Sequence, residues 1–290
     1  MSKMMKDQST IEPIWEGRDG AILARPGDPR VMGILNVTPD SFSDGGESDS
    51  VEAAVAKARR LVASGARVID IGGESSRPGA EPVSLDEELR RVVPVIEAVA
   101  STVSVPISID SAKTEVARRA IVAGASIVNT IRGADDDPEL DRLVADADVS
   151  IVIMHMQGNP QTMQIAPSYE NVVSEVIESL RGRIERLEAA GVKPRRIAVD
   201  PGIGFGKRSE HNRALLRELD RFATLDKAVL VGVSRKRFLG SLSGREIADR
   251  DIATVAASLW AISKGASIVR VHDVNAMIDA ILVWQGIKIP

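Results

Sequence analysis

The sequence of 290 residues contains no cysteine, which excludes disulfide bonds, thiolate metal sites and a catalytic thiol. Aromatic residues make up only 3% of the chain, so stacked aromatic platforms for single-stranded nucleic acid are not expected. No uninterrupted apolar stretch approaches the roughly 20 residues of a membrane-spanning helix, and the polar first ten residues lack the apolar segment of a signal peptide. These absences predict a cytoplasmic protein that binds neither nucleic acid nor membrane.

The charge of the chain is nearly balanced, with a formal net charge of −4 and no long basic run. An anionic substrate would therefore have to be held by a local cluster of cations. The hydrophobic content of 44% is ample for a sizeable core. Length alone allows one large or two small domains, because α/β barrels commonly need about 250 residues as one domain.

From Val31 onward, short β-branched runs alternate strictly with longer segments of helical period. Eight strand–helix pairs are expected. The expected strands are residues 31–35, 67–71, 106–109, 126–129, 150–154, 196–199, 228–233 and 267–271. The expected helices are residues 51–64, 84–103, 113–123, 138–147, 168–190, 209–224, 248–264 and 273–286.

This alternation predicts an α/β fold of the (β/α)8 TIM-barrel class. Continuous apolar strands are typical of a parallel sheet covered by helices, and eight units without an obvious second domain favour a closed barrel over an open doubly wound sheet. Residues 31–290 are expected to form this single domain, and residues 1–30 a poorly ordered arm or a small cap. The longest strand-to-helix connections, 36–50 and 72–83, are candidate mobile loops.

The expected strands end in polar residues, at the face where the active sites of such barrels lie. One or two would be unremarkable, because strand ends meet solvent or cap helices. A ring of them around one mouth indicates a polar ligand. The ring consists of Asn36, Asp110, Asn129, His155, Asp200, Ser234, Arg235, Lys236, Arg270 and His272.

The charges in this ring fall into two groups. Asp110, Asn129 and Asp200 suit a flat heterocycle with adjacent N–H groups, because a carboxylate accepts two parallel hydrogen bonds. The cationic group suits phosphate oxygens. It comprises Arg77, Lys236, Arg270 and His272.

Two long motifs give the sequence a family resemblance. MGILNVTPDSFSDGG at 32–46 and IDIGGESSRPGA at 69–80 resemble the two signatures of dihydropteroate synthases. Six further blocks follow in the family's order: SID at 108–110, VN at 128–129, MHMQG at 154–158, DPGIGFGK at 200–207, GVSRKRFLG at 232–240 and VRVHDV at 269–274. The resemblance covers about residues 31–280 and is far more specific than a lone glycine motif.

The resemblance implies a pterin-binding (β/α)8 barrel, usually a homodimer, that uses Mg2+. Such a transferase of folate biosynthesis condenses 6-hydroxymethyl-7,8-dihydropterin diphosphate with p-aminobenzoate. The products are 7,8-dihydropteroate and pyrophosphate. Thr130 follows Asn129 where the family commonly has Asp, a departure that removes a charge.

The resemblance also implies roles for individual residues. Asn36 would be the metal-linked residue near the diphosphate, and Ser76, at the family's Thr position, would lie with Arg77 in the second mobile loop. The pterin pocket would be lined by Asp110, Asn129, Asp200 and Lys236, with Met154 and Phe205 as apolar walls. Arg270 and His272 would grip the diphosphate. Catalysis would depend on Asp110, Asp200, Lys236 and Arg270.

The reaction most needs help at departure of the diphosphate, because the aryl amine requires no strong base. Mg2+ beside Asn36, with Arg270 and His272, would neutralise the leaving group, and the two carboxylates would favour the cation left on the pterin methylene. The p-aminobenzoate carboxylate is expected near Arg237, at a helix start. We expect His155 to be a satisfied hydrogen-bonding residue. Lys207 could simply be a solvated charge beside a glycine turn, and we assign it no role.

Three other functions remain open on sequence grounds. A pterin-dependent methyltransferase would keep the Asp and Asn strand ends but would have no need of Arg77 with Arg270 and His272. A Schiff-base aldolase could use Lys236, although this lysine is not expected to be desolvated by apolar neighbours. A pterin-binding homologue without catalysis, or with weak activity, is the third.

Overall fold

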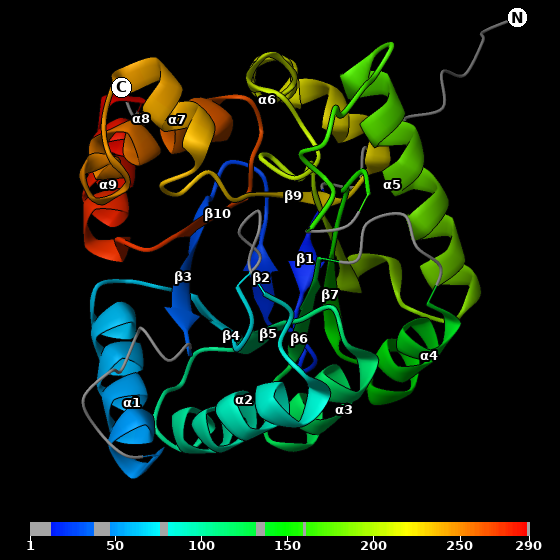
Figure 1. Ribbon diagram of the computed structural model, residues 1–290, viewed down its shortest axis with the longest axis vertical. Helices are drawn as coiled ribbons and strands as arrows, with labels where there is room; N and C mark the ends of the chain where they lie inside the picture. Colours follow the sequence, from blue (N-terminus) through cyan, green and yellow to red (C-terminus); the bar gives the residue numbers. More distant parts are fainter. Residues whose placement is uncertain (1–12, 38–46, 76–80, 132–136, 159–160, 289–290) are drawn as a thin grey trace, which may run out of the picture.

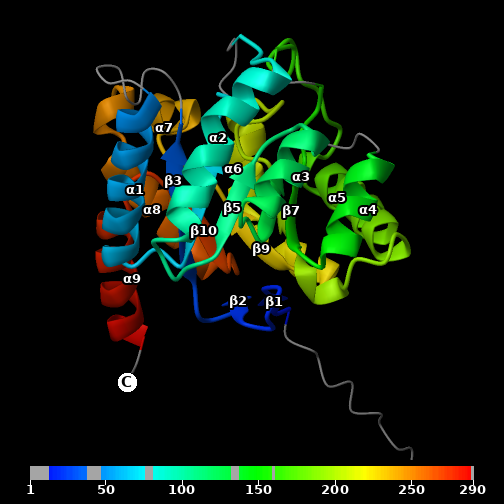
Figure 2. The same ribbon diagram turned by 90° about the horizontal axis from the view of Figure 1, so that it is seen from below.

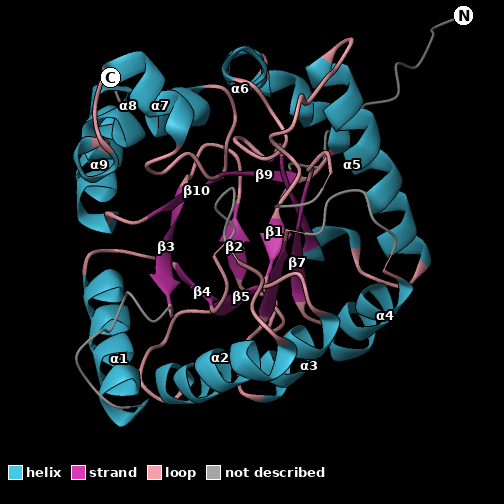
Figure 3. Ribbon diagram, viewed as in Figure 1, coloured by secondary structure: helices cyan, strands magenta, loops and turns pink. Residues whose placement is uncertain are grey.

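The computed structural model describes residues 13–37, 47–75, 81–131, 137–158 and 161–288. Eight parallel strands close into a barrel in the order β10-β3-β4-β5-β6-β7-β8-β9, drawn in magenta in Figure 3. The barrel strands are β3 (Arg30–Asn36), β4 (Val68–Gly72), β5 (Ile107–Asp110), β6 (Ile127–Thr130), β7 (Ser150–Met154), β8 (Ile197–Asp200), β9 (Ala228–Val231) and β10 (Ile268–Val271). All eight expected strands are present, which confirms the TIM-barrel prediction.

A ring of helices surrounds the barrel (Figure 1). The α-helices are α1 (Glu47–Ala63), α2 (Leu85–Ala100), α3 (Thr114–Val122), α4 (Pro138–Ala147), α5 (Val172–Ala189), α6 (Ser209–Arg217), α7 (Arg237–Ser243), α8 (Asp251–Ser263) and α9 (Val274–Lys288). Short 3-10 helices are η2 (Pro194–Arg196), η3 (Leu219–Leu225) and η4 (Ile247–Asp249). Within the described residues, no helix has the length and apolar character needed to cross a membrane.

Side-chain caps explain where several helices begin. The Asn171 side chain accepts a hydrogen bond from the Ser174 amide at 3.0 Å, and the Asp137 side chain accepts one from the Leu140 amide at 3.0 Å. Each cap satisfies an amide that has no partner inside its helix. The cap at Asn171 therefore starts α5 at Val172, four residues later than periodicity indicates.

The structure differs from the sequence prediction between residues 209 and 250. The helix expected over 209–224 is divided into α6 and the 3-10 helix η3, and α7 is an additional seven-residue helix before α8. Helix α7 is too short for a periodicity signal, because two turns contain too few apolar repeats.

Alternation along the strands separates two apolar layers. One face of each strand packs against the helices in the main hydrophobic core. The opposite face points into the barrel, where side chains from the strands form a second buried cluster. The strand residues of this inner cluster are Met32, Val68, Ile127, Val152, Ala198, Ala228, Leu230 and Ile268. They fill the barrel floor, near the N-terminal ends of the strands.

A small antiparallel hairpin lies beneath this floor. Its strands are β1 (Trp15–Glu16) and β2 (Ile22–Ala24), and Figure 2 shows them below the barrel, on the side opposite α7. Trp15 and two residues of the second strand segment belong to the same buried cluster as the barrel floor. The Trp15 indole donates to the Arg196 carbonyl at 3.0 Å.

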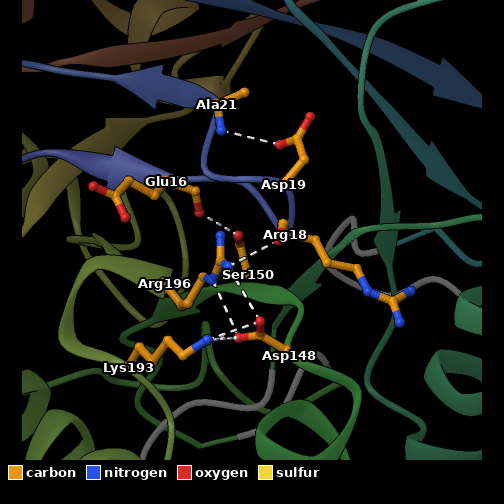
Figure 4. A network of polar contacts seen from close by, with 8 residues as sticks. All are labelled: Glu16, Arg18, Asp19, Ala21, Asp148, Ser150, Lys193 and Arg196. Carbon is orange, nitrogen blue, oxygen red and sulfur yellow. Dashed lines mark hydrogen bonds and ion pairs between the residues drawn. The ribbon is translucent and has the colours of Figure 1, made fainter.

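Polar contacts tie the hairpin to the barrel (Figure 4). The Ser150 hydroxyl donates to the Glu16 carbonyl at 2.6 Å, and Arg196 donates to the Arg18 carbonyl at 3.1 Å. Arg196 also pairs with Asp148, which accepts hydrogen bonds from Lys193. The hairpin therefore covers the end of the barrel that carries none of the predicted site residues.

Candidate active site

The site forms one layer above the apolar floor. Each strand points its side chains inward at every second residue, so the residue two positions after a floor residue also faces the barrel interior. Among the residues two positions after floor residues are Asp70, Asn129, Met154, Asp200, Gly232 and Arg270, and Ile34, after Met32, continues the apolar layer on β3. The ring of polar side chains is therefore the direct continuation of the core.

An ion-pair network crosses this layer. The Arg270 guanidinium donates through Nε to Asp70 at 2.5 Å and through Nη2 to Asp110 at 2.5 Å. The Asn129 amide donates to the same Asp70 oxygen at 3.1 Å. Asp70 is fully buried, and its other oxygen, Oδ1, has no hydrogen-bond partner within the described residues.

Asp200 lies beside this network. Its Oδ1 accepts a hydrogen bond from the Gly202 amide at 2.7 Å. A Cβ atom placed on Gly232 would lie 4.0 Å from Asp200 Oδ2 and 3.8 Å from the Arg270 Cβ. The absence of a side chain at Gly232 thus leaves Asp200 and Arg270 facing the same small space.

Lys236 and Phe205 form a second contact at the mouth. The Lys236 ammonium lies 4.4 Å from the centre of the Phe205 ring and donates to the Ile203 carbonyl. Phe205 packs against a cluster of three buried methionines, one of which is the predicted wall residue Met154. This part of the site offers the apolar surface that a flat ring would stack on.

The electrostatics of the layer are dominated by burial. Burial raises the pKa of Asp110 to about 7, with the Asp70 carboxylate adding to the shift and the Arg270 guanidinium opposing it. Burial likewise raises the pKa of Asp200, against the opposing effect of Lys236. Burial lowers the pKa of Lys236 to about 8, so the expectation that this lysine is not desolvated is wrong.

The remaining predicted site residues lie at the edge of this network or outside the described residues. His272 shares a hydrogen bond between its Nδ1 and the Ser234 hydroxyl at 2.9 Å. Asn36 ends β3 beside Gly72 of β4 and is partly exposed. Ser76 and Arg77 lie outside the described residues. Thr130 is fully buried, and strand alternation places it on the face opposite that of Asn129.

Sequence reasoning missed two charged residues of this region. Asp70 could have been found, because it is a lone charge at an inward position of the apolar strand VIDIG. Lys207 has no role in the sequence prediction, and the alternative that it is a solvated charge is wrong, since this side chain is 2% exposed. Its Nζ lies 3.0 Å from His155 Nδ1, which confirms that His155 has a hydrogen-bond partner.

The donor chemistry of Asn36 is compatible with the predicted metal ion. Within the described residues, no group of three or more His, Cys, Asp or Glu side chains could hold a metal. The Asn36 amide oxygen is a hard ligand of the kind that Mg2+ accepts, and Mg2+ commonly takes most of its other ligands from water and phosphate.

Comparison with known proteins agrees with this geometry. A model of the family described as pterin binding enzyme matches residues 32–272. A dihydropteroate synthase of Synechocystis is 48% identical to this chain over 248 residues, which cover 85% of this chain and 86% of that protein. The chain belongs to the dihydropteroate synthase family.

Solved structures of this family have the same fold. A dihydropteroate synthase of Xanthomonas albilineans with 4-aminobenzoic acid superposes with a TM-score of 0.88 at 48% identity, covering 96% of this chain and 99% of that one. The structure of the enzyme from the same organism in complex with 7,8-dihydropteroate gives a TM-score of 0.82 at 47% identity, covering 91% and 95% of the two chains.

Proposed function

We propose that this chain is a transferase that makes 7,8-dihydropteroate from 6-hydroxymethyl-7,8-dihydropterin diphosphate and p-aminobenzoate. The aryl amine nitrogen forms a bond to the pterin methylene carbon, the bond from that carbon to the diphosphate oxygen breaks, and the amine loses one proton. The observation that carries the proposal is that Asp110, Asp200 and Arg270 lie close together. The two carboxylates can accept hydrogen bonds from the pterin ring, and the guanidinium can bind the diphosphate.

The pterin ring is assigned to the inner layer. Asp200 has one oxygen held by the Gly202 amide and the other facing open space, so it can accept from adjacent ring N–H groups. Asn129 and Lys236 supply further polar contacts, and Met154 with Phe205 supply the apolar wall. As the methylene gains positive charge, the buried carboxylates stabilise it more strongly than water would.

The diphosphate is assigned to the cationic side. Arg270 is already directed into the site by Asp70 and Asp110, and His272 follows it by two residues. Binding of the dianionic or trianionic leaving group would let Arg270 exchange one carboxylate for phosphate oxygens. We assign Mg2+ to the diphosphate and the Asn36 side chain. When bound, the ion would neutralise charge on the leaving group.

The p-aminobenzoate is assigned to the outer part of the mouth. Helix α7 begins at Arg237, whose side chain is exposed, so its guanidinium is available to a carboxylate. Ser76 and Arg77 are proposed to close over the nucleophile and exclude water, which otherwise competes for the methylene. We also assign the enzyme to the cytoplasm, because a diphosphate ester does not readily leave the compartment in which it is made.

A turnover assay tests the proposed reaction. The full chain is mixed with the pterin diphosphate, p-aminobenzoate and Mg2+, and pyrophosphate and dihydropteroate are measured. We expect both products to form in equal amounts and only when p-aminobenzoate is present. A chain that binds the pterin diphosphate in calorimetry but forms no product would instead be the pterin-binding homologue without catalysis.

We further propose that two copies of this chain form a dimer through the surface of α7, η4, α8 and α9. The three α-helices gather on one side of the barrel in Figure 1. Seven of the exposed large apolar side chains in the described residues lie there. They are Leu242, Ile247, Ile252, Trp260, Leu282, Val283 and Ile287. Apolar patches of this kind mark protein interfaces more often than free surface.

Sedimentation of matched variants tests the dimer. Ile252 on α8 and Val122 on α3 are 86% and 84% exposed, respectively. We expect Ile252→Asp to dissociate the dimer, because the charge would be buried at the interface, and Val122→Asp to leave it intact. A monomeric wild type at micromolar concentration would refute the assignment.

A further inference from the structure

Lys207 and His155 form a buried contact directly behind the pterin-facing layer. The Lys207 ammonium lies within hydrogen-bond distance of three groups: His155 Nδ1 at 3.0 Å, the His155 carbonyl at 3.1 Å and the Phe205 carbonyl at 2.9 Å. An ammonium has three N–H groups, so each finds one acceptor if His155 carries its proton on Nε2. Two of the three acceptors belong to the residue that follows β7, and the third belongs to the loop after β8.

The loop after β8 packs so closely against the end of β7 that Gly202 and Gly206 have no room for a side chain. A Cβ atom on Gly202 would come within 1.8 Å of the His155 carbonyl oxygen, and one on Gly206 within 2.5 Å of the Gln157 carbonyl oxygen. The Tyr169 hydroxyl adds a bond of 2.7 Å to the Gly206 carbonyl. The segment 201–206 is therefore held against the end of β7 at both of its ends.

This segment in turn determines the position of Asp200. The Gly202 amide binds Asp200 Oδ1 at 2.7 Å, and a Cβ atom on Gly202 would lie 3.2 Å from the Lys207 ammonium. Phe205 and the Ile203 carbonyl, which contact Lys236, lie on the same segment. Lys207 thus contacts the side of the loop 201–206 that faces the protein interior, and Asp200, Phe205 and Lys236 lie on the side that faces the site.

Lys207 adds a positive charge behind a layer that contains several carboxylates. The nearest carboxylates are Asp70, Asp110 and Asp200, and the nearest cations are Lys207, Lys236 and Arg270. Glu88 also acts on Asp110, and it shares Lys113 with Glu74. An unbalanced negative charge in such a place is costly.

We propose that Lys207 is a positioning residue for pterin binding. Its ammonium, bound to His155 and the Phe205 carbonyl, fixes the loop after β8 and supplies the buried positive charge that keeps Asp200 ionised. The charged groups that face Asp200 are Lys236 at the start of α7, Lys207 after β8 and Arg270 on β10. Lys207 differs from the other two because three protein groups already surround it, which leaves it no role in direct contact with substrate.

The electrostatics of the site agree with this assignment. Burial lowers the pKa of Lys207 to about 7, and the Asp200 carboxylate opposes that shift. Burial, together with the charge of Lys207, lowers the pKa of His155 to about 3, so His155 is a neutral acceptor at working pH. Removing the Lys207 charge leaves Asp200 with one cation fewer and raises its pKa further.

The test compares Lys207→Met with Lys227→Met. Lys227 is a matched control because it is 8% exposed, pairs with Glu188 at 2.8 Å and precedes β9 at the opposite end of the barrel. Binding of 6-hydroxymethyl-7,8-dihydropterin, without the diphosphate, is measured by calorimetry across pH. This binding readout matters because the inference rests on the proposed function, and binding is measurable even if condensation is not found.

For Lys207→Met we expect pterin affinity at neutral pH to fall about tenfold or more, and the loss of binding at acid pH to begin about one pH unit higher. The KM for p-aminobenzoate should change by less than about twofold, because its proposed site lies at the start of α7 and not on this loop. Lys227→Met should match the wild type in pterin affinity, in the pH at which binding is lost and in the KM for p-aminobenzoate. An unchanged pH profile in folded Lys207→Met, or the same shift in the control, would overturn the proposal.

Variants of His155 keep the test decisive if Lys207→Met does not fold. Asn places its side-chain oxygen where His155 has Nδ1, whereas Leu removes the acceptor. We expect His155→Asn to bind the dihydropterin within about threefold of the wild type and His155→Leu to lose about tenfold or more. Equal affinities of these two variants would refute the role of the Lys207–His155 contact.

Discussion

Asp200 combines near-complete burial with an oxygen that faces open space. One oxygen is held by the Gly202 amide, and the other lies near the gap left by Gly232. Such a carboxylate gains little from the protein and has its best partner in a ligand. Its negative charge, more than its hydrogen bonds, is what the proposed cationic transition state requires.

Asp200→Asn separates these two contributions, because the amide keeps the shape and can still accept from Gly202. We expect turnover to fall more than about tenfold, since a buried charge near a developing cation contributes several kcal/mol at most sites of this kind. The melting temperature should change little, because removing the desolvated charge of Asp200 is offset by the loss of its attraction to Lys207 and Lys236. Steady-state kinetics and thermal unfolding check both points, and a near-normal rate would refute the electrostatic role.

For single residues, the sequence predicts which side chains lie together in the site but not which of them form ion pairs. Asp110, Asn129, Asp200 and Arg270 were expected at one mouth from their places at strand ends, and the structure places them there. Their partners could not be foreseen, because the two carboxylates that hold Arg270 are 200 and 160 residues away in the chain. Burial of Lys207 was missed because its charge lies in a glycine-rich segment that looks exposed.

At the scale of elements, the loop after β8 is the tightest connection of the site. Gly202 has a φ of +70°, a conformation that other residues adopt only with strain, and its α-carbon lies against the His155 carbonyl. Gly244, at the end of α7, has nearly the same φ of +69° but open space around it. Substitutions at Gly202 and Gly244 therefore separate the effect of a positive φ, which both share, from the effect of close packing, which only Gly202 has.

Gly202→Ala should displace this loop, because its new methyl group would overlap the carbonyl oxygen. We expect pterin affinity to fall about tenfold or more, together with a lower melting temperature. Gly244→Ala should cost only about 1 kcal/mol of backbone strain and leave affinity unchanged. Calorimetric binding and denaturant unfolding measure both, and equal effects of the two substitutions would contradict the packing argument.

The N-terminal hairpin is the second element whose role can be tested. We expect Trp15→Ala to lower the free energy of unfolding by about 3–5 kcal/mol, because Trp15 is fully buried and its indole binds the Arg196 carbonyl. Ile22→Ala, on the exposed side of the same hairpin, should cost much less. Urea unfolding provides the measurement. Turnover below the melting temperature should stay near normal in both, since the hairpin lies at the far end of the barrel.

For the whole molecule, pH links the site to stability. Burial raises the pKa of Asp110 from 3.8 to about 7 in the fold, so the folded state binds this proton more tightly than the unfolded chain. The resulting stabilisation is complete below the unfolded value and is lost as the pH rises through the folded one. The carboxylate therefore costs stability at the pH where its charge is needed.

Asp110→Asn should remove this dependence. We expect the melting temperature of the variant, relative to the wild type, to rise by a few degrees between about pH 5 and about pH 8. The exposed Asp220 gives the control, since Asp220→Asn should keep a constant difference across the range. Differential scanning calorimetry over pH decides it, and a falling difference for Asp110→Asn would show that the sign is wrong.

The barrel architecture could be predicted from the sequence more completely than the short elements that flank it. Alternating apolar periods identified all eight strands, because a closed parallel barrel buries both faces of each strand. Two features had no such signal. Helix α7 is too short for periodicity, and the hairpin at Trp15–Ala24 is stabilised mainly by contacts with the distant barrel floor.

The filled floor gives the barrel a single entrance. Apolar side chains from the strands, together with Trp15, close one end of the interior, so no ligand can pass through the molecule. A ring-shaped substrate bound against that closed end would have to arrive before its smaller reaction partner, and the joined product would have to leave the way both came in.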